Sequence, residues 1–407
     1  MTIDRPAEVD LDAIDLVDPR TYLVNDMPAV WREFRRREPV FRHREVDGRP
    51  GFWVLSRYHD QVVIYRDSKR FGIERGNLLS TMLGGGDSAG GRMVSVTDGP
   101  RHRDLRAVIL RAFSPRALEY FAERVRRYTH GLLDDVVARG AGDFAAEVAA
   151  KVPINTICDL LGVPDPDRAF LLEQNTLAMS SDDPEHTELD ARMARSEILM
   201  YFTDLVSQRT AAPGEDVISL LATTEVDGAL LPAHDVVLNC YGLLVAGEET
   251  SRYSLSAAVH ALATWKDEWA RLRGGKVDLG TATDEMLRWA TPVMHVGRTA
   301  LEDVSVGGRL IARDDIVTLW TSSANRDDEV FDAPDTLDLG RTPNKHLAFG
   351  FGPHYCLGVF LARAEISAVL EGLRDRVTGV ELDGPVQRIY SNVLDGISAL
   401  PVRFTPA

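Results

Sequence analysis

The stretch FGFGPHYCLGVFLARAE, residues 349–365, is the most informative part of this chain. Gly350 and Gly358 let the backbone adopt conformations that are closed to other residues and approach a flat object closely. Cys356 stands just before a helix predicted over about 357–376, and the dipole and free N–H groups at a helix start favour a thiolate over a thiol. A thiolate in a tight glycine loop is what an axial haem ligand requires. The alternative is a buried structural cysteine near a turn, a common situation for free cysteines.

The same stretch fits a longer pattern, F-x-x-G-x-x-x-C-x-G-x-x-x-A-x-x-E, through Phe349, Gly352, Cys356, Gly358, Ala362 and Glu365. This pattern resembles the haem-binding loop of the cytochrome P-450 family. The resemblance implies that Cys356 is the ligand to the iron of haem b and that Phe349, Gly350 and Gly358 help to bind the cofactor. It extends over nearly the whole chain, from Trp53 to a C-terminal turn at 391–397, and implies the fold of that family.

A second motif is E-M-L-R at residues 285–288. Opposite charges three residues apart on a helix are usually a solvated pair worth only about 0.2–0.5 kcal/mol. Beside the cysteine loop, however, the motif resembles the E-x-x-R of the K helix in the same family. The resemblance implies a buried structural network with a third partner from an irregular stretch that ends near residue 345. Arg341 is the best candidate for that partner and Arg326 the alternative.

A third motif, AGEETS at residues 246–251, interrupts an apolar helix predicted from about 232 to 265. Buried acids are costly without partners, so the alternative is an exposed acidic face. The motif resembles the (A/G)-G-x-(D/E)-T-(T/S) of the I helix, which crosses the distal face of the haem. The resemblance implies that Thr250 hydrogen-bonds the iron-bound oxygen species and that Glu249 connects it to bulk protons. Glu248 stands at a variable position of the motif and receives no role.

Cations are expected at the two propionates of the porphyrin, since a guanidinium grips a carboxylate with two hydrogen bonds. Four positions match the family here. His102 and Arg106 are spaced as H-x-x-x-R on a predicted helix, Arg298 follows the E-x-x-R motif, and His354 lies two residues before the cysteine. Each alone is compatible with an ordinary surface residue.

The resemblance implies a haem-thiolate monooxygenase that activates O2 and oxidises a small organic substrate, with secondary-metabolite biosynthesis as the expected setting. We find no flavin or iron–sulfur motif, so two electrons from NAD(P)H are expected to arrive through a ferredoxin or flavodoxin-type partner. Arg103, Arg111 and Arg363 are candidates for its docking face. Two alternatives remain: an oxygenase that uses peroxide directly, and a non-catalytic haem-binding sensor or carrier.

The substrate pocket is expected to take its walls from residues 76–93, from 170–200, from the segment after Pro292 and from the C-terminal turn. The glycine-rich loop 76–91 is a candidate lid. Acids in 173–190 would repel an acidic carrier protein, which favours a free small molecule. Apolar candidates for the walls, each of which could equally be core, are Leu79, Met82, Met93, Val245, Met294, Val296 and Val393.

Composition limits the function classes. The chain has 407 residues, 44% of them hydrophobic, and a formal net charge of −16, which disfavours a nucleic-acid partner. Three dispersed cysteines suit a reducing cytoplasm. No signal peptide and no apolar run long enough for a membrane anchor is recognisable.

We therefore expect a mainly α protein with small antiparallel β-sheets, forming a single cytochrome P-450-like domain over residues 1–407 without a reductase domain. A strand is predicted at 52–55, helices over 99–138 with a break at Ser114-Pro115, and a hairpin around Gly307-Gly308.

Overall fold

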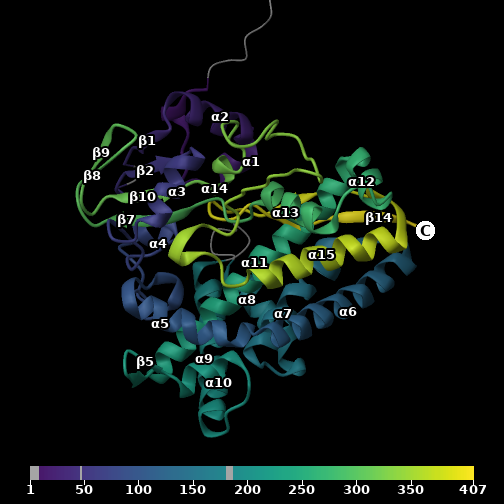
Figure 1. Ribbon diagram of the computed structural model, residues 1–407, viewed down its shortest axis with the longest axis horizontal. Coiled ribbons are helices and arrows are strands. Elements are labelled where there is room, and N and C mark those ends of the chain that lie inside the picture. The colour runs from purple at the N-terminus through teal and green to yellow at the C-terminus, as the bar shows by residue number, and fades with distance from the viewer. Residues whose placement is uncertain (1–8, 46–47, 180–186) are drawn as a thin grey trace, which may run out of the picture.

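The computed structural model describes residues 9–45, 48–179 and 187–407, and helices dominate it (Figure 1). This confirms the predicted fold class. The α-helices of the described part are α1 Arg20–Val24, α2 Met27–Arg37, α3 Tyr58–Arg66, α4 Leu79–Leu83, α5 Gly99–Leu110, α6 Pro115–Arg139, α7 Lys151–Leu161, α8 Arg168–Ala178, α9 Glu188–Ala211, α10 Val217–Thr223, α11 Ala233–Thr264, α12 Lys266–Arg273, α13 Leu279–Ala290, α14 Thr321–Ala324 and α15 Val359–Arg376.

Small sheets lie at the edges of the helical body. The largest has the order β1-β2-β10-β7-β3; its pairs are antiparallel as expected, except that β2 and β10 run parallel. The predicted hairpin is β8–β9. The strands are β1 Val40–His43, β2 Phe52–Leu55, β3 Phe71–Gly72, β4 Ala141–Asp143, β5 Glu225–Val226, β6 Ala229–Leu230, β7 Val296–Ala300, β8 Val304–Val306, β9 Arg309–Ile311, β10 Ile316–Leu319, β11 Val377–Leu382, β12 Gln387–Arg388, β13 Ile397–Ala399 and β14 Pro401–Pro406.

Capping residues begin two of the long helices close to the positions predicted from the sequence. The Ser114 side chain accepts a hydrogen bond from the Ala117 N–H and caps α6, so the predicted break between the two basic helices is confirmed. The helix predicted from about residue 232 is α11. Pro232 is its N-cap, and the first helical residue is Ala233. From there α11 runs for 32 residues, about 50 Å, through the whole molecule (Figure 1).

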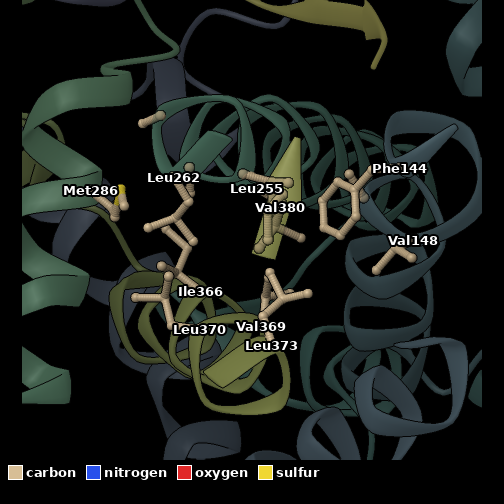
Figure 2. Packing of buried hydrophobic residues seen from close by; sticks show 14 of the residues in the cluster. Phe144, Val148, Leu255, Leu262, Met286, Ile366, Val369, Leu370, Leu373 and Val380 are labelled. Atoms are coloured by element: carbon tan, nitrogen blue, oxygen red, sulfur yellow. The ribbon is translucent and has the colours of Figure 1, made fainter. Parts of the chain in front are cut away.

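The largest hydrophobic cluster holds α11 against α15 and α13. Figure 2 shows Leu255 and Leu262 of α11 on one side, and Ile366 and Leu370 of α15 on the other. Met286 of α13 lies beside them. All five side chains are buried, so the three helices that carry the three sequence motifs are fixed relative to one another by close packing.

The Glu285 carboxylate is the centre of a buried ionic network below this core. It accepts hydrogen bonds from Arg288 at 2.7 and 2.8 Å and from Arg341 at 3.1 and 3.2 Å. The prediction that Arg341 completes the E-x-x-R network is confirmed. Arg326, the alternative, instead stacks on Trp289 at 4.2 Å. Arg288 also donates to the carbonyls of Asn325, Pro334 and Thr336, so the network ties α13 to the irregular segment that precedes the cysteine loop.

Candidate functional site

A cavity of about 320 Å³ is enclosed by α5, α7, α11, α15, β7 and the loop that carries Cys356. The cavity brings together side chains that are far apart in the sequence. Of the ten site residues expected from the sequence, all but Glu249 line it: His102, Arg106, Thr250, Arg298, Phe349, Gly350, His354, Cys356 and Gly358.

The loop around Cys356 is held by backbone contacts that only glycine allows. The Cys356 N–H donates to the Phe349 carbonyl oxygen at 3.0 Å and closes the loop. Gly350 and Gly352 have φ values of 67° and 73°, in the left-handed region. A Cβ on Gly352 would lie 2.5 Å from the carbonyl oxygen of Tyr65 in α3. The glycines therefore set the course of the loop and its close approach to α3.

The cysteine thiol differs from the prediction. Burial raises the pKa of Cys356 above its ordinary value, and this outweighs the Gly358 N–H and the Arg106 charge, which lower it. The expectation that the helix start favours a thiolate was wrong for the protein alone, because α15 begins only at Val359 and the sulfur lies among protein atoms. A metal cation deprotonates a thiol that coordinates it. The Cys356 thiolate is therefore expected when the sulfur binds a metal.

Two arginine side chains, Arg106 and Arg298, line the cavity and lack a carboxylate partner among the described residues. The Arg298 guanidinium is buried, donates to the Gly297 carbonyl at 2.7 Å and lies 5.5 Å from the Tyr65 ring centre. Within residues 9–45, 48–179 and 187–407, neither Arg298 nor Arg106 has a carboxylate in ion-pair distance. Burial lowers the pKa of both arginines, which indicates that the cavity favours an anionic occupant.

The two histidines form a pair beside these arginines. The rings of His102 and His354 are 4.0 Å apart, and His354 Nε2 lies 3.5 Å from an Asp98 carboxylate oxygen. Burial, then the charges of His354 and Arg106, lower the pKa of His102 to about 4. His102 is therefore neutral near pH 7 and offers a hydrogen bond rather than the cation that was expected.

Helix α11 forms another part of the cavity wall. Ala246, Gly247, Thr250 and Ser251 line it, and the Thr250 hydroxyl donates to the Ala246 carbonyl oxygen at 2.8 Å. This bond occupies the hydroxyl hydrogen and leaves the oxygen lone pairs of a cavity-lining residue free to accept a hydrogen bond.

Comparisons with known proteins agree with this geometry. A family model described as cytochrome P-450 matches residues 279–373. Cytochrome P-450 NovI of Streptomyces niveus is 44% identical over 396 residues, which cover 97% of each chain. This chain belongs to the cytochrome P-450 family. Linalool 8-monooxygenase of Pseudomonas putida, a second relative, is 35% identical over 96% of this chain and 99% of its own. A crystal structure of the P-450 OxyD, described as involved in the biosynthesis of vancomycin-type antibiotics, superposes with a TM-score of 0.88 at 36% identity, over 97% and 100% of the chains.

The protein is thus a cytochrome P-450 monooxygenase, a family that uses haem. The residues of the cavity fit that cofactor. Two propionates would supply the negative charge that Arg106 and Arg298 lack, and the Cys356 sulfur is the soft ligand that haem iron accepts in this family. Among the described residues no helix is both long and apolar enough to cross a bilayer.

The two acids of the P-450 I-helix motif lie behind the cavity rather than in it. Glu248 is fully buried and Glu249 is 2% exposed. Glu249 therefore does not reach bulk water directly, and Glu248 does not lie on a solvent-facing side of α11.

Most of the apolar candidates for the P-450 pocket wall, each of which could equally be core, do not line the cavity. Of the seven apolar candidates only Val296 lines the cavity. Leu79, Met82 and Met294 are core residues, and Met93 packs on Gly242. The acids Asp182, Asp183 and Glu185 lie outside the described residues. The apolar wall is formed by Ile73, Val94, Phe113, Ile157, Leu160, Leu243, Val293 and Val296.

The structure also places a buried acid in the cavity wall itself, Glu365 of α15, which the sequence indicated only as a motif letter. Its carboxyl is 2% exposed and lies in hydrogen-bond reach of Ser251 from α11 and Thr156 from α7. Burial raises its pKa to about 7, and the two hydroxyls only partly offset this.

We expect Glu365 to make stability fall with pH. Because its folded-state pKa is raised, the folded protein holds this proton more tightly than the unfolded chain. Its contribution is complete below the ordinary carboxyl pKa and is lost as pH rises to about 7. Chemical unfolding of wild type and Glu365→Gln should therefore differ progressively, in favour of the variant, across that interval. A constant difference between the two proteins would contradict this assignment.

Proposed function

We propose that this P-450 hydroxylates, or oxidises in a similar way, a small organic molecule of microbial secondary metabolism, with two electrons from NAD(P)H delivered by a ferredoxin or flavodoxin-type protein. The observation that carries the proposal is that Cys356 from the glycine loop and Thr250 from α11 line one largely apolar cavity. The similarity to OxyD, described as acting in antibiotic biosynthesis, supports the metabolic setting.

When bound, haem with a thiolate ligand supplies the activation and cleavage of dioxygen. The chain would hold it with few groups. Cys356 would bind the iron, and Arg106 and Arg298 would pair with the propionates, to which His102 and His354 would add hydrogen bonds. Gly358 leaves open the space beside the sulfur, where a Cβ would lie 3.9 Å from it, and Gly350 holds the loop in its left-handed turn. Phe349 of the same loop completes the expected cofactor-binding set.

Thr250 and Glu249 would control protons in this cavity. The Thr250 oxygen accepts a hydrogen bond from a water or a protonated group on the cavity side, since its own hydrogen is engaged with Ala246. Glu249 precedes it on α11 and would supply protons from behind the helix. General acid catalysis of this kind contributes about 10²–10⁴ in rate.

The apolar wall would bind the substrate. Ile157, Leu243 and Val296 from three different elements face the cavity, while Asn77 and Ser95 add the few polar groups that fix orientation. A free small molecule of largely apolar character fits this lining.

The electron donor would dock near the cysteine loop. Arg66 lies 4.8 Å from the Phe351 ring centre, and Arg363 lies 5.3 Å from that of Phe349. Arg66 is exposed, whereas Arg363 also pairs with Asp284 at 2.8 Å. Arg103 and Arg111 are exposed as well, but Arg111 is engaged by a hydrogen bond to Thr224, the C-cap residue of α10. An acidic donor is therefore expected to meet Arg66, Arg363 and Arg103, and reversing the charge of Arg66 should raise its apparent KM most at low salt.

A cytoplasmic location is part of the proposal. All three cysteines, Cys158, Cys240 and Cys356, are free thiols, as suits a reducing compartment. Reduced ferredoxin or flavodoxin would meet the enzyme there.

One experiment tests the function. Ligands that displace water from the cavity shift the resting haem spectrum, so a library of natural-product precursors is first screened for such shifts. The binders are then incubated with holoenzyme and either ferredoxin, reductase and NAD(P)H, or hydrogen peroxide alone. Oxidised product with the electron donor is the expected result. Product formed only with peroxide would show a peroxide-dependent oxygenase instead. No product under either condition would indicate a haem-binding sensor or carrier.

A further inference from the structure

Two consecutive acids on α11, Glu248 and Glu249, are enclosed by protein immediately behind Thr250. The Asn175 side-chain amide of α8 donates to Glu248 Oε2 at 2.8 Å. Among the described residues, Glu248 Oε1 and both carboxyl oxygens of Glu249 have no hydrogen-bond partner. Two ionised, buried carboxylates with three oxygens that accept no hydrogen bond would be strongly unfavourable, so at least one of the two acids needs a proton.

The charges around the pair allow one ionised carboxylate but not two. On α11 itself, Arg252 is 3.8 Å from Glu249 Oε1. The Tyr253 phenol lies next to Glu249, and burial raises its pKa so that it stays neutral. From α8 comes the neutral Asn175, and from β4 the Asp143 carboxylate acts on Arg252. In the part of the chain that the structure describes, one cation, Arg252, therefore faces two acids.

The position of the proton follows from these contacts. Of the two acids, Glu249 is the one in ion-pair distance of the Arg252 guanidinium. Burial and the neighbouring Glu249 raise the pKa of Glu248 well above its ordinary value. The Asn175 bond occupies Glu248 Oε2, which leaves Oε1 as the atom that can carry a hydrogen toward Glu249.

We propose that Glu248 and Glu249 share one proton and that Glu248 returns a proton to Glu249 each time Glu249 has released one toward Thr250. This rests on the proposed oxygen-activating function. In the step, the O–H bond at Glu248 Oε1 breaks and an O–H bond forms at a Glu249 oxygen. Glu248 is then reprotonated from water along α8, where its hydrogen-bond partner Asn175 is followed by the exposed Thr176. Glu248 acts through Glu249 and is a positioning residue, not a catalytic one.

The test is an infrared measurement on holoenzyme, well above the pKa of about 7 of Glu365, so that this other buried acid is ionised. Wild type should show the carbonyl stretch of a protonated carboxylic acid. Glu248→Gln should lose it, and Glu248→Asp should restore it. Glu173→Gln, an exposed acid on α8, is the matched control and should keep the band. A band that persists in Glu248→Gln would overturn the proposal.

A second readout is the product formed per NAD(P)H across pH. Wild type should keep its yield as pH rises, because the shared proton is retained, whereas the yield of Glu248→Gln should fall. An unchanged pH profile after loss of the band would overturn the delivery role. Asn175→Ala covers the case in which Glu248→Gln does not fold: it should shift the band without removing it, and an unmoved band would contradict the contact. Absence of product from wild type would refute the proposed function instead, and the infrared result would still decide the sharing.

Discussion

Replacing Glu285 by Gln should lower the free energy of unfolding by about 3–5 kcal/mol, the usual cost of breaking a buried ion pair from one side. Glu285, Arg288 and Arg341 are almost fully buried, and the Glu285 carboxylate also accepts from the Asp338 N–H at 3.0 Å and the Asn344 amide at 3.1 Å. An amide at this position would leave two guanidinium groups without their counter-ion. Chemical unfolding of the holoenzyme, followed by circular dichroism, measures the effect.

Glu123→Gln is the matched control for that experiment. Glu123 pairs with Arg127 at 3.3 Å on α6, and its side chain is 58% exposed. Surface pairs of this kind contribute about 0–1 kcal/mol. Equal losses in the two variants would show that the Glu285 network does not stabilise the fold.

Thr250→Ala should lower product formation about a hundred-fold while the consumption of NAD(P)H continues. The methyl side chain removes the oxygen that faces the cavity but keeps the helix, because alanine is the strongest helix former. The quantity to measure is product formed per reductant consumed, with one of the ligands found in the spectral screen.

The control for this variant is Thr264→Ala on the same helix. Thr264 makes the same bond as Thr250, from its hydroxyl to the carbonyl of the residue four positions earlier, at 2.8 Å, but it does not line the cavity. Its yield should equal that of wild type. An undiminished yield in Thr250→Ala would remove Thr250 from proton delivery.

Much of the architecture could be predicted because the chemistry of haem ligation is concentrated in a few short motifs. The Cys356 loop needs glycines at fixed places, and Gly352 has no room for a Cβ against Tyr65. The Glu285 network was predictable only through the resemblance of E-M-L-R to the K-helix motif, with Arg341 as the best candidate partner, because the spacing alone is typical of a solvated pair. Helix ends followed local rules, as at Ser114.

What could not be predicted depends on contacts between distant segments. Apolar periodicity marks Leu79 and Met294 as buried, but it does not tell whether a buried side chain faces the core or a cavity. The amide that orients Glu248 comes from Asn175 on another helix, and no spacing rule connects them. Arg66 lies beside the cysteine loop only because α3 packs against that loop. The packing is close, since a Cβ on Gly352 would lie 2.5 Å from the carbonyl oxygen of Tyr65, the residue before Arg66.

The thiol of Cys356 shows how burial can reverse a local rule. A helix start favours a thiolate, but desolvation inside the protein outweighs that preference. Thiolate formation is thereby coupled to cofactor binding, so protein without haem should carry a protonated thiol at this position.

The most direct measurement of the central assignment, Cys356 as the thiolate ligand of a bound haem, is the absorption spectrum of the reduced carbon monoxide complex. Only a thiolate ligand gives the strongly red-shifted Soret band, so purified holoenzyme should show it and Cys356→Ser, with haem added, should not. The same band in Cys356→Ser, or its absence from folded wild type with bound haem, would contradict the assignment.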